Sequence, residues 1–202
     1  MRYGAGVRWA DFERQQPRFA SLGREKLSGP GVVLVGTVRK DGTPRISPVE
    51  PLFCDGDLWL TMGHGSLKAR DLQRDPRVLV HSIVTSRDGT DGEYKVRGRA
   101  IEEVDPSLNA RIAGAVLQQL GWRFEVGTFH LFRIEVEDVT FMSEQRPVSE
   151  PLAGGARASA PRDFRDEHWA SGTAFRVSGL AAGDCRKTDH PLFSGLKPPA
   201  SS

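Results

Sequence analysis

The fold is decided by residues 32–62, VVLVGTVRKDGTPRISPVEPLFCDGDLWLTM. In this stretch, runs of β-branched and apolar residues alternate with two short turns, Asp41-Gly42 and Asp55-Gly56-Asp57. An aspartate-glycine pair between two such runs is a strong β-hairpin signal, because tight hairpin turns need residues that accept a positive φ. The stretch therefore predicts two successive hairpins. Their strands are expected at 32–38 with 45–49, and at 51–54 with 58–62.

The strand pattern continues on the C-terminal side of these hairpins. Further strands are expected at 78–84, 94–101, 129–136 and 139–142, and helices at 67–74 and 106–120. The last helix opens with Asp105-Pro106 and closes at Gly121, as helix start and stop signals should. Residues 30–143 are therefore predicted to form a mainly β (α+β) fold, a small antiparallel β-barrel of six to seven strands with short flanking helices.

The two ends of the chain differ from this central part. Residues 1–29 form an N-terminal helical segment, with short helices within 9–27 that Pro17 divides and an apolar stripe that suits packing on the barrel. Residues 144–202 hold six prolines and six glycines without a sustained period, which predicts a largely disordered tail. Within it, residues 166–179 could add one short strand if they dock on the barrel.

Composition narrows the function classes. The 202 residues carry a formal net charge of +2, with Lys+Arg 28 against Asp+Glu 26, which argues against broad nucleic-acid binding. No apolar run is long enough for a membrane span, and the N-terminus does not resemble a signal peptide. Cys54 and Cys185 form no CxxC pattern, so a reduced, cytoplasmic protein is expected. No metal-spaced cluster and no hydrolase motif is present, so no metal site is predicted.

Residues 63–78, GHGSLKARDLQRDPRV, raise the possibility of an anion site. A helix start carries free backbone N–H groups, and here Gly63 and Gly65 allow close approach while Ser66 and Lys68 add a hydroxyl and a charge. The competing interpretation is a capped turn whose lysine reaches into water. If the strand that Arg45 begins lies beside the strand leading into this turn, Arg45 and Lys68 would converge on one anion.

These same blocks resemble a known family. "GTVRKDGTPRISPV", "DGDLWLTM", "GSLKARDLQRDPRV" and "YKVRGRAIEEV" are similar to the pyridoxamine 5'-phosphate oxidase-like family of flavin- and deazaflavin-binding split β-barrels, over about residues 17–143. The resemblance implies a homodimer with the cofactor at the subunit interface. It assigns cofactor binding to Arg45, Ser66 and Lys68 at the phosphate, to Ser47, Pro48 and Val49 beside the flavin ring, and to Thr61 and Met62 before the turn.

The function implied by the resemblance is an FMN-dependent oxidoreductase acting on a small organic substrate, with no catalytic residue identified. Leu67 stands where pyridoxamine phosphate oxidases have a basic residue, and the tail lacks their tryptophan–arginine block, so pyridoxal phosphate synthesis is not expected. One alternative is a reductase that uses the deazaflavin coenzyme F-420, whose acidic tail a basic strip of Lys95, Arg97 and Arg99 could receive. Another is a non-catalytic module that binds flavin or haem.

Overall fold

The structure is a computed structural model of the chain. It describes residues 6–121, 123, 125 and 127–143, together with the backbone of 173–178. The helices are α1 (Trp9–Gln15), α2 (Pro17–Ser28), α3 (Leu67–Arg74) and α4 (Pro106–Leu120). The strands are β1 (Val33–Val38), β2 (Pro44–Val49), β3 (Pro51–Cys54), β4 (Asp57–Gly63), β5 (Arg77–His81), β6 (Glu93–Glu103), β7 (Phe129–Ser143) and β8 (Thr173–Ser178).

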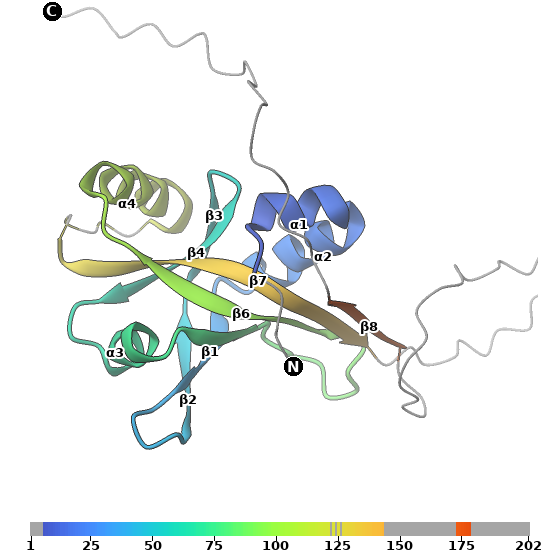
Figure 1. Ribbon diagram of the computed structural model, residues 1–202. Coiled ribbons are helices and arrows are strands. Elements are labelled where there is room, and N and C mark those ends of the chain that lie inside the picture. The colour runs from blue at the N-terminus through green and yellow to red at the C-terminus, as the bar shows by residue number, and fades with distance from the viewer. Residues whose placement is uncertain (1–5, 122, 124, 126, 144–172, 179–202) are drawn as a thin grey trace, which may run out of the picture.

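One antiparallel sheet contains every strand in the described part of the chain. Its order is β2-β1-β5-β6-β7-β4-β3, and β8 is added to β7 (Figure 1). The sheet curls until β2 contacts β4, although the two strands are far apart in the strand order. The predicted mainly β split barrel is therefore confirmed. In this arrangement β2 is a terminal strand, and no described residue pairs with its second edge.

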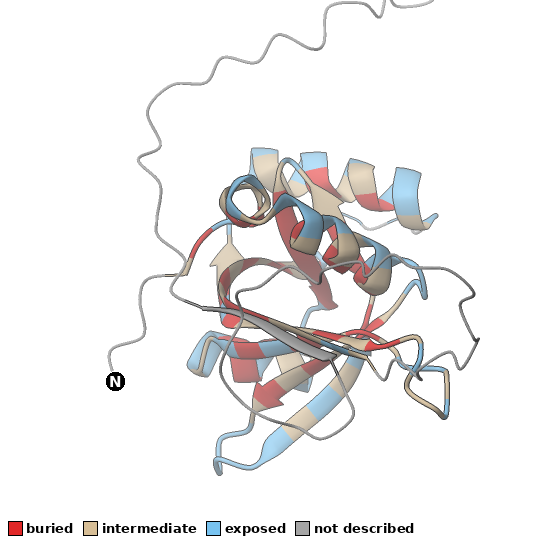
Figure 2. Cartoon of the chain, turned by 90° about the vertical axis from the view of Figure 1, so that its right-hand side faces the viewer, coloured by how far each residue is buried: buried red, intermediate tan, exposed pale blue. Residues whose placement is uncertain are grey.

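Both predicted hairpins are present, and their turns have the expected backbone. Between β1 and β2, Gly42 has a φ of 84°, and the backbone N–H of Thr43 donates to Asp41 Oδ1 at 3.0 Å. Between β3 and β4, Asp55 and Gly56 have φ values of 53° and 74°. Two adjacent residues with positive φ give a turn whose twist matches that of the flanking strands. The β1–β2 hairpin projects from the barrel and is largely exposed (Figure 2).

The helices begin and end where the local signals predict. Gln15 ends α1 and Pro17 opens α2, so the division at Pro17 is confirmed. At the start of α4, the Asp105 side chain accepts a hydrogen bond from the backbone N–H of Ser107 at 2.8 Å. At its end, Gly121 has a φ of 72°, the left-handed conformation that glycine adopts without a steric penalty.

Two apolar clusters hold the fold together. The barrel interior is closed at one end by α1, whose Trp9 and Phe12 are fully buried, and by α2. A second cluster lies where α4 packs on β3, β4 and β7; its buried members are Leu52, Trp59, Ile112, Val116, Phe129 and Leu131. Alternation along β5 and β6 turns Val78, Val80, Tyr94 and Val96 into the barrel, whereas Arg77, Leu79 and Arg99 face outward.

The prediction of two separate strands at 129–136 and 139–142 is wrong, because β7 runs through both without a break. Opposite it, the register passes from Gly98↔Val136 to Arg97↔Asp138. Glu137 is therefore an extra residue in β7, a β-bulge that keeps the strand paired while it bends. The charged pair Glu137-Asp138 gives the sequence signal of a turn, but it marks this bulge.

The tail contributes one strand to the sheet. Residues Thr173–Ser178 form β8, which pairs antiparallel with residues 138–143 of β7, so the suggestion that 166–179 could supply a docked strand is confirmed. The rest of the predicted disordered tail, Cys185 included, lies outside the described residues. No helix among the described residues is long and apolar enough to cross a membrane.

Candidate functional site

The loop between β4 and α3 is built to start a helix abruptly. Gly65 has a φ of 74°, and the backbone N–H of Ser66 donates to the carbonyl of Gly63 at 3.1 Å, which closes the turn. The first helical hydrogen bond follows at once, from Arg70 N–H to the Ser66 carbonyl at 3.1 Å. The first turn of α3 therefore has backbone N–H groups without partners inside the helix, as any helix start does.

Two side chains at this helix start lack the partners they need. Ser66 is the N-cap residue, as predicted, yet its side chain makes no capping hydrogen bond. Its Oγ atom is shielded from solvent and has no hydrogen-bond partner among the described residues. Lys68, half-buried in the first turn, makes no ion pair with any residue that the structure describes. A lysine here opposes the helix dipole, so a bound anion would satisfy both groups.

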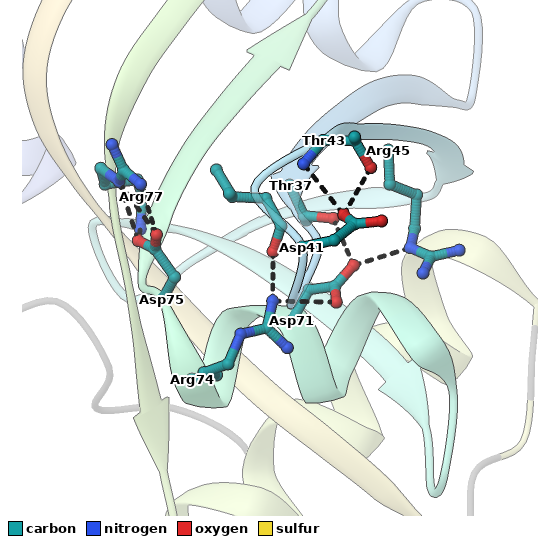
Figure 3. A network of polar contacts seen from close by, with 9 residues as sticks. Thr37, Asp41, Thr43, Arg45, Asp71, Arg74, Asp75 and Arg77 are labelled. Atoms are coloured by element: carbon teal, nitrogen blue, oxygen red, sulfur yellow. Dashed lines mark hydrogen bonds and ion pairs between the residues drawn. The ribbon is translucent and has the colours of Figure 1, made fainter.

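Arg45 is held against the same helix by a buried carboxylate. Its Nε donates to Asp71 Oδ2 at 2.7 Å, and the Thr37 hydroxyl donates to the same oxygen at 3.0 Å (Figure 3). The other oxygen, Oδ1, accepts from Arg74 Nη2 at 3.2 Å. Arg74 also donates to the Val38 carbonyl. This network joins α3 to β1 and β2, and Asp71 lies one helical turn beyond Lys68.

Asp71 remains ionised in this setting. Burial by itself would raise the pKa of the Asp71 carboxyl, but hydrogen bonds from Arg45, Thr37 and Arg74 outweigh it and hold the pKa below its usual range. A buried carboxylate without such partners would be strongly unfavourable. The negative charge of Asp71 is therefore a permanent part of the site at neutral pH.

A groove lies between the β1–β2 hairpin and α3, and we call it the basic groove. It has a volume of about 530 Å³ and is lined by Arg39, Lys40, Asp41, Arg45, Leu67, Arg70, Asp71 and Arg74. Five of these eight residues are cations and two are acids, so the groove carries a surplus of positive charge. Ser66 and Lys68 do not line it, although they lie at the start of the same helix.

A second groove, the outer groove, lies on the outward face of β1, β2, β5 and β6. Its volume is about 910 Å³, and Arg45 lines both grooves. Cross-strand pairs place Ile46, Gly36 and Leu79 side by side at its centre. Ile46 is 69% exposed and Leu79 38% exposed, which is unusual for large aliphatic side chains. Charged residues border this apolar centre: Arg77, Arg97, Arg99, Glu135 and Glu137.

The other predicted cofactor residues lie on β2 and β4. Ser47 and Pro48 are on the open strand β2, whose unpaired edge offers backbone groups to a ligand. Val49, Thr61 and Met62 are buried, and Met62 belongs to the barrel core at 1% exposure. The possibility that the strand of Arg45 lies beside the strand leading into the turn is met by contact but not by strand pairing. β2 pairs with β1, while β4 pairs with β3 and β7, and the two meet only where the barrel closes.

The predicted basic strip on β6 is largely neutralised by nearby acids. Lys95 forms an ion pair with Glu93, and Arg97 forms ion pairs with Glu137 at 2.7 Å and with Asp138 at 3.4 Å. Both acids of Arg97 lie on the neighbouring strand β7. Only the positive charge of Arg99 has no acidic partner among the described residues. The surplus positive charge therefore lies in the basic groove instead.

The thiol of Cys54, at the end of β3, stays protonated at neutral pH. Burial, and then the neighbouring Asp55 carboxylate, raise the pKa of the Cys54 thiol above its usual value. Asp57, in the same turn, is fully buried and paired with Arg8. This turn therefore has a structural role.

Sequence reasoning missed Asp71, the residue that organises Arg45. The only local signal was its spacing: with Leu67, Arg70 and Arg74 it forms an i, i+3, i+4, i+7 stripe on α3. Such a stripe of charged residues is typical of a solvated helix face, so it did not point to burial. Only the approach of the β1–β2 hairpin makes Asp71 a buried partner of Arg45.

Comparison with known proteins shows which protein family this chain matches. Residues 23–143 match the pyridoxamine 5'-phosphate oxidase family, which is more than half of the 202-residue chain. No curated protein sequence matches the chain. A conserved hypothetical protein from Mycobacterium tuberculosis superposes with a TM-score of 0.55 at 19% identity, covering 69% of this chain and 93% of that one.

Two further solved structures share the fold. A heme binding protein from Mycobacterium smegmatis gives a TM-score of 0.52 at 20% identity, over 62% of this chain. This chain spans only 54% of the length of that protein. A protein proposed to act in 5-nitroimidazole antibiotic resistance, from Bacteroides thetaiotaomicron, gives 0.51 at 16% identity, over 62% of this chain and 82% of that one. At these identities the likeness shows the fold alone.

Proposed function

The chain belongs to the pyridoxamine 5'-phosphate oxidase family, and from this premise we propose that it is an oxidoreductase that binds FMN at the interface of a homodimer. Its substrate would be a small organic molecule that the flavin oxidises or reduces. The bound flavin would supply the hydride chemistry, so the chain itself needs only to bind, orient and shield the cofactor.

The observation that carries the proposal is the unsatisfied start of α3. Ser66 Oγ is buried without a partner, and Lys68 is a half-buried cation without an acid in the described part of the chain. Leaving a buried hydroxyl unpaired costs free energy, as does a lysine beside the positive end of a helix. A phosphate group would accept hydrogen bonds from both, and Arg45 on β2, which is tied to α3 through Asp71, would supply a second cation.

The remaining family positions suit the rest of a flavin. The open edge of β2 at Ser47 and Pro48 leaves backbone groups free to meet a planar ring. Val49, Thr61 and Met62 are buried behind that edge, so they would support the site from within the barrel and not through exposed side chains.

The proposal of a homodimer is supported by the outer groove. A monomer would expose the apolar centre formed by Ile46 and Leu79, and an apolar patch with a charged border is typical of a protein interface. The border of the groove contains both positive charges, from Arg77 and Arg99, and negative charges, from Glu135 and Glu137. A surface that binds a second copy of itself requires such a mixture. Because Arg45 lines this groove too, a partner subunit would lie directly beside the proposed cofactor.

A second candidate cofactor is favoured by one observation. The basic groove extends from Arg45 past Lys40 and Arg70, two cations without acidic partners among the described residues, and past Arg39, whose charge interacts with that of Asp41. A single phosphate does not need so many cations, whereas the deazaflavin coenzyme F-420 carries an acidic tail beyond its phosphate. The alternative proposal is therefore an F-420-dependent reductase that uses the same Arg45 and Lys68.

Reconstitution tests the proposal and separates its alternatives. The purified protein is incubated with FMN, with F-420 or with haem, desalted, and the visible spectrum of the protein peak is recorded. FMN absorbance in the protein peak supports the main proposal, and retention of F-420 alone selects the deazaflavin. Retention of haem alone, or of flavin that no reductant or substrate turns over, would identify a non-catalytic binding module.

Lys68→Ala tests the site itself. Loss of one charged hydrogen bond to the phosphate should weaken FMN binding by about 1.5–3 kcal/mol and leave the fold intact. Lys26→Ala is the matched control, since Lys26 is also half-buried but lies on α2. A fluorescence titration in which both variants bind FMN as tightly as the wild type would remove Lys68 from the site.

A further inference from the structure

We propose that Asp71 is a positioning residue for the cofactor site: it fixes the Arg45 guanidinium through its Nε and thereby aims the remaining donors of Arg45 at a phosphate. The inference rests on the proposed function, because it assumes that a phosphate binds beside Arg45. It adds a residue to the site that no motif of the sequence identifies.

The contacts show how completely Asp71 is committed to this task. The residue is only 4% exposed, and its carboxylate accepts hydrogen bonds from three elements. Thr37 of β1 and Arg45 of β2 donate to Oδ2 at 3.0 and 2.7 Å, and Arg74 of α3 donates to Oδ1 at 3.2 Å. With these bonds the carboxylate has no remaining need for a ligand, so Asp71 does not itself bind the cofactor.

The donors of Arg45 divide between this contact and the grooves. A guanidinium has five N–H donors in a rigid plane. The Nε donor is used by Asp71, and Arg45 makes no other hydrogen bond within the described residues. In Figure 3 its terminal nitrogens point away from Asp71. Arg45 lines both grooves and keeps 20% of its side chain exposed, so this free edge faces the space that a ligand would enter.

Two opposite effects of Asp71 on an anion can be separated. Its negative charge repels a phosphate, but that charge is balanced by Arg45 and Arg74. Its hydrogen bond orders an arginine side chain that would otherwise lose rotamer freedom when the phosphate binds. If orientation dominates, removal of the carboxylate weakens phosphate binding, although the site becomes more positive. If charge dominates, removal strengthens it.

The experiment compares FMN with riboflavin, which has the same ring and no phosphate. The riboflavin dissociation constant divided by the FMN dissociation constant reports the phosphate site alone, because a general loosening of the fold would affect both ligands. Asp71→Ala should reduce this ratio at least about tenfold, the equivalent of about 1.4 kcal/mol. Asp71→Asn keeps an acceptor oxygen for Arg45, so its ratio of dissociation constants should stay within about threefold of the wild-type ratio.

Asp75→Ala is the matched control for charge. Asp75 follows α3 directly, pairs with Arg77 at 2.5 Å and does not line the basic groove, so its removal changes the net charge equally. The riboflavin-to-FMN ratio of dissociation constants should be unchanged in this variant. An Asp75→Ala effect as large as that of Asp71→Ala would overturn the proposal.

Arg45→Lys covers the case in which Asp71→Ala does not fold. Lysine keeps the charge but has no second edge to present while it pairs with Asp71, so the ratio should fall as in Asp71→Ala. A phosphate preference that survives in the folded variants overturns the role of Asp71 and leaves the proposed function standing. A wild type that binds FMN and riboflavin equally removes the phosphate site, and this role with it. If reconstitution selects F-420, the same ratio is measured with its phosphate-free chromophore.

Discussion

Gly23 shows how closely one residue controls the packing of a whole helix. It lies on α2 against the ring of Tyr94, and a Cβ at this position would lie 2.6 Å from both Cζ and the hydroxyl oxygen of that ring. Tyr94 is fully buried and donates its hydroxyl proton to the Phe19 carbonyl at 2.9 Å, so the ring cannot move aside cheaply. The helix can therefore approach the barrel only because residue 23 has no side chain.

Gly23→Ala should lower the free energy of unfolding by about 1–3 kcal/mol, because the added methyl group overpacks the contact with Tyr94. Gly114→Ala on α4 is the control, since nothing lies within 4 Å of a Cβ placed there. That change should raise the free energy of unfolding by up to about 1 kcal/mol through helix propensity. Urea denaturation of both variants checks the pair, and equal shifts in the two would refute the close contact.

At the scale of elements, the second edge of β7 is completed by three separate segments. β4 pairs with residues 129–133, Val7 bridges to Val136 with N···O distances of 2.9 and 2.8 Å, and β8 pairs with residues 138–143. Within the described residues, β6 is the strand that covers the first edge of β7. Because an unpaired strand edge is a template for association, β8 protects the barrel as well as extending it.

Truncation after Gln145 should therefore leave a folded barrel that associates more readily than the full chain, since residues 138–143 lose their partner strand. A chain truncated after Ser178 keeps β8 and serves as the control. Light scattering across a range of protein concentrations, with hydrogen exchange of the 138–143 amides, measures both effects. Identical association and exchange in the two truncated chains would show that β8 does not protect this edge.

At the scale of the whole molecule, the proposed function links assembly to cofactor binding through the outer groove. Its apolar centre lies on the outward face of the barrel strands, and Arg45 reaches it from the same strand that holds Ile46. A partner subunit seated there would exclude water from the apolar centre and enclose the cofactor at once. Dimerisation and flavin retention should therefore be lost together.

Leu79→Asp should convert the dimer to a monomer and abolish FMN retention after desalting, because it places a charge in the centre of the apolar face. Leu117→Asp is the control: Leu117 is 41% exposed, close to the 38% of Leu79, but it lies on α4. Size-exclusion chromatography with light scattering gives the mass of each variant. A Leu79→Asp protein that remained dimeric would place the interface on another face.

Much of the fold could be predicted because its signals are local. The turn at Asp41-Gly42, the division at Pro17 and the caps Asp105 and Gly121 each act on residues next to them, and the structure confirms each one. The strand that continues through Glu137-Asp138 could not be predicted, because a bulge becomes visible only when the partner strand supplies the register.

The sequence by itself determined most of the elements, the barrel class and the cations Arg45 and Lys68 that a phosphate would need. Only the tertiary structure decided which strands are neighbours, that Lys95 and Arg97 are neutralised, and that Asp71 holds Arg45. Thr37 and Asp71 are 34 residues apart in the chain, and their contact depends on how the hairpin meets α3. Local preferences act over a few residues, whereas the charge balance of a site depends on contacts between distant segments that form only when the barrel closes.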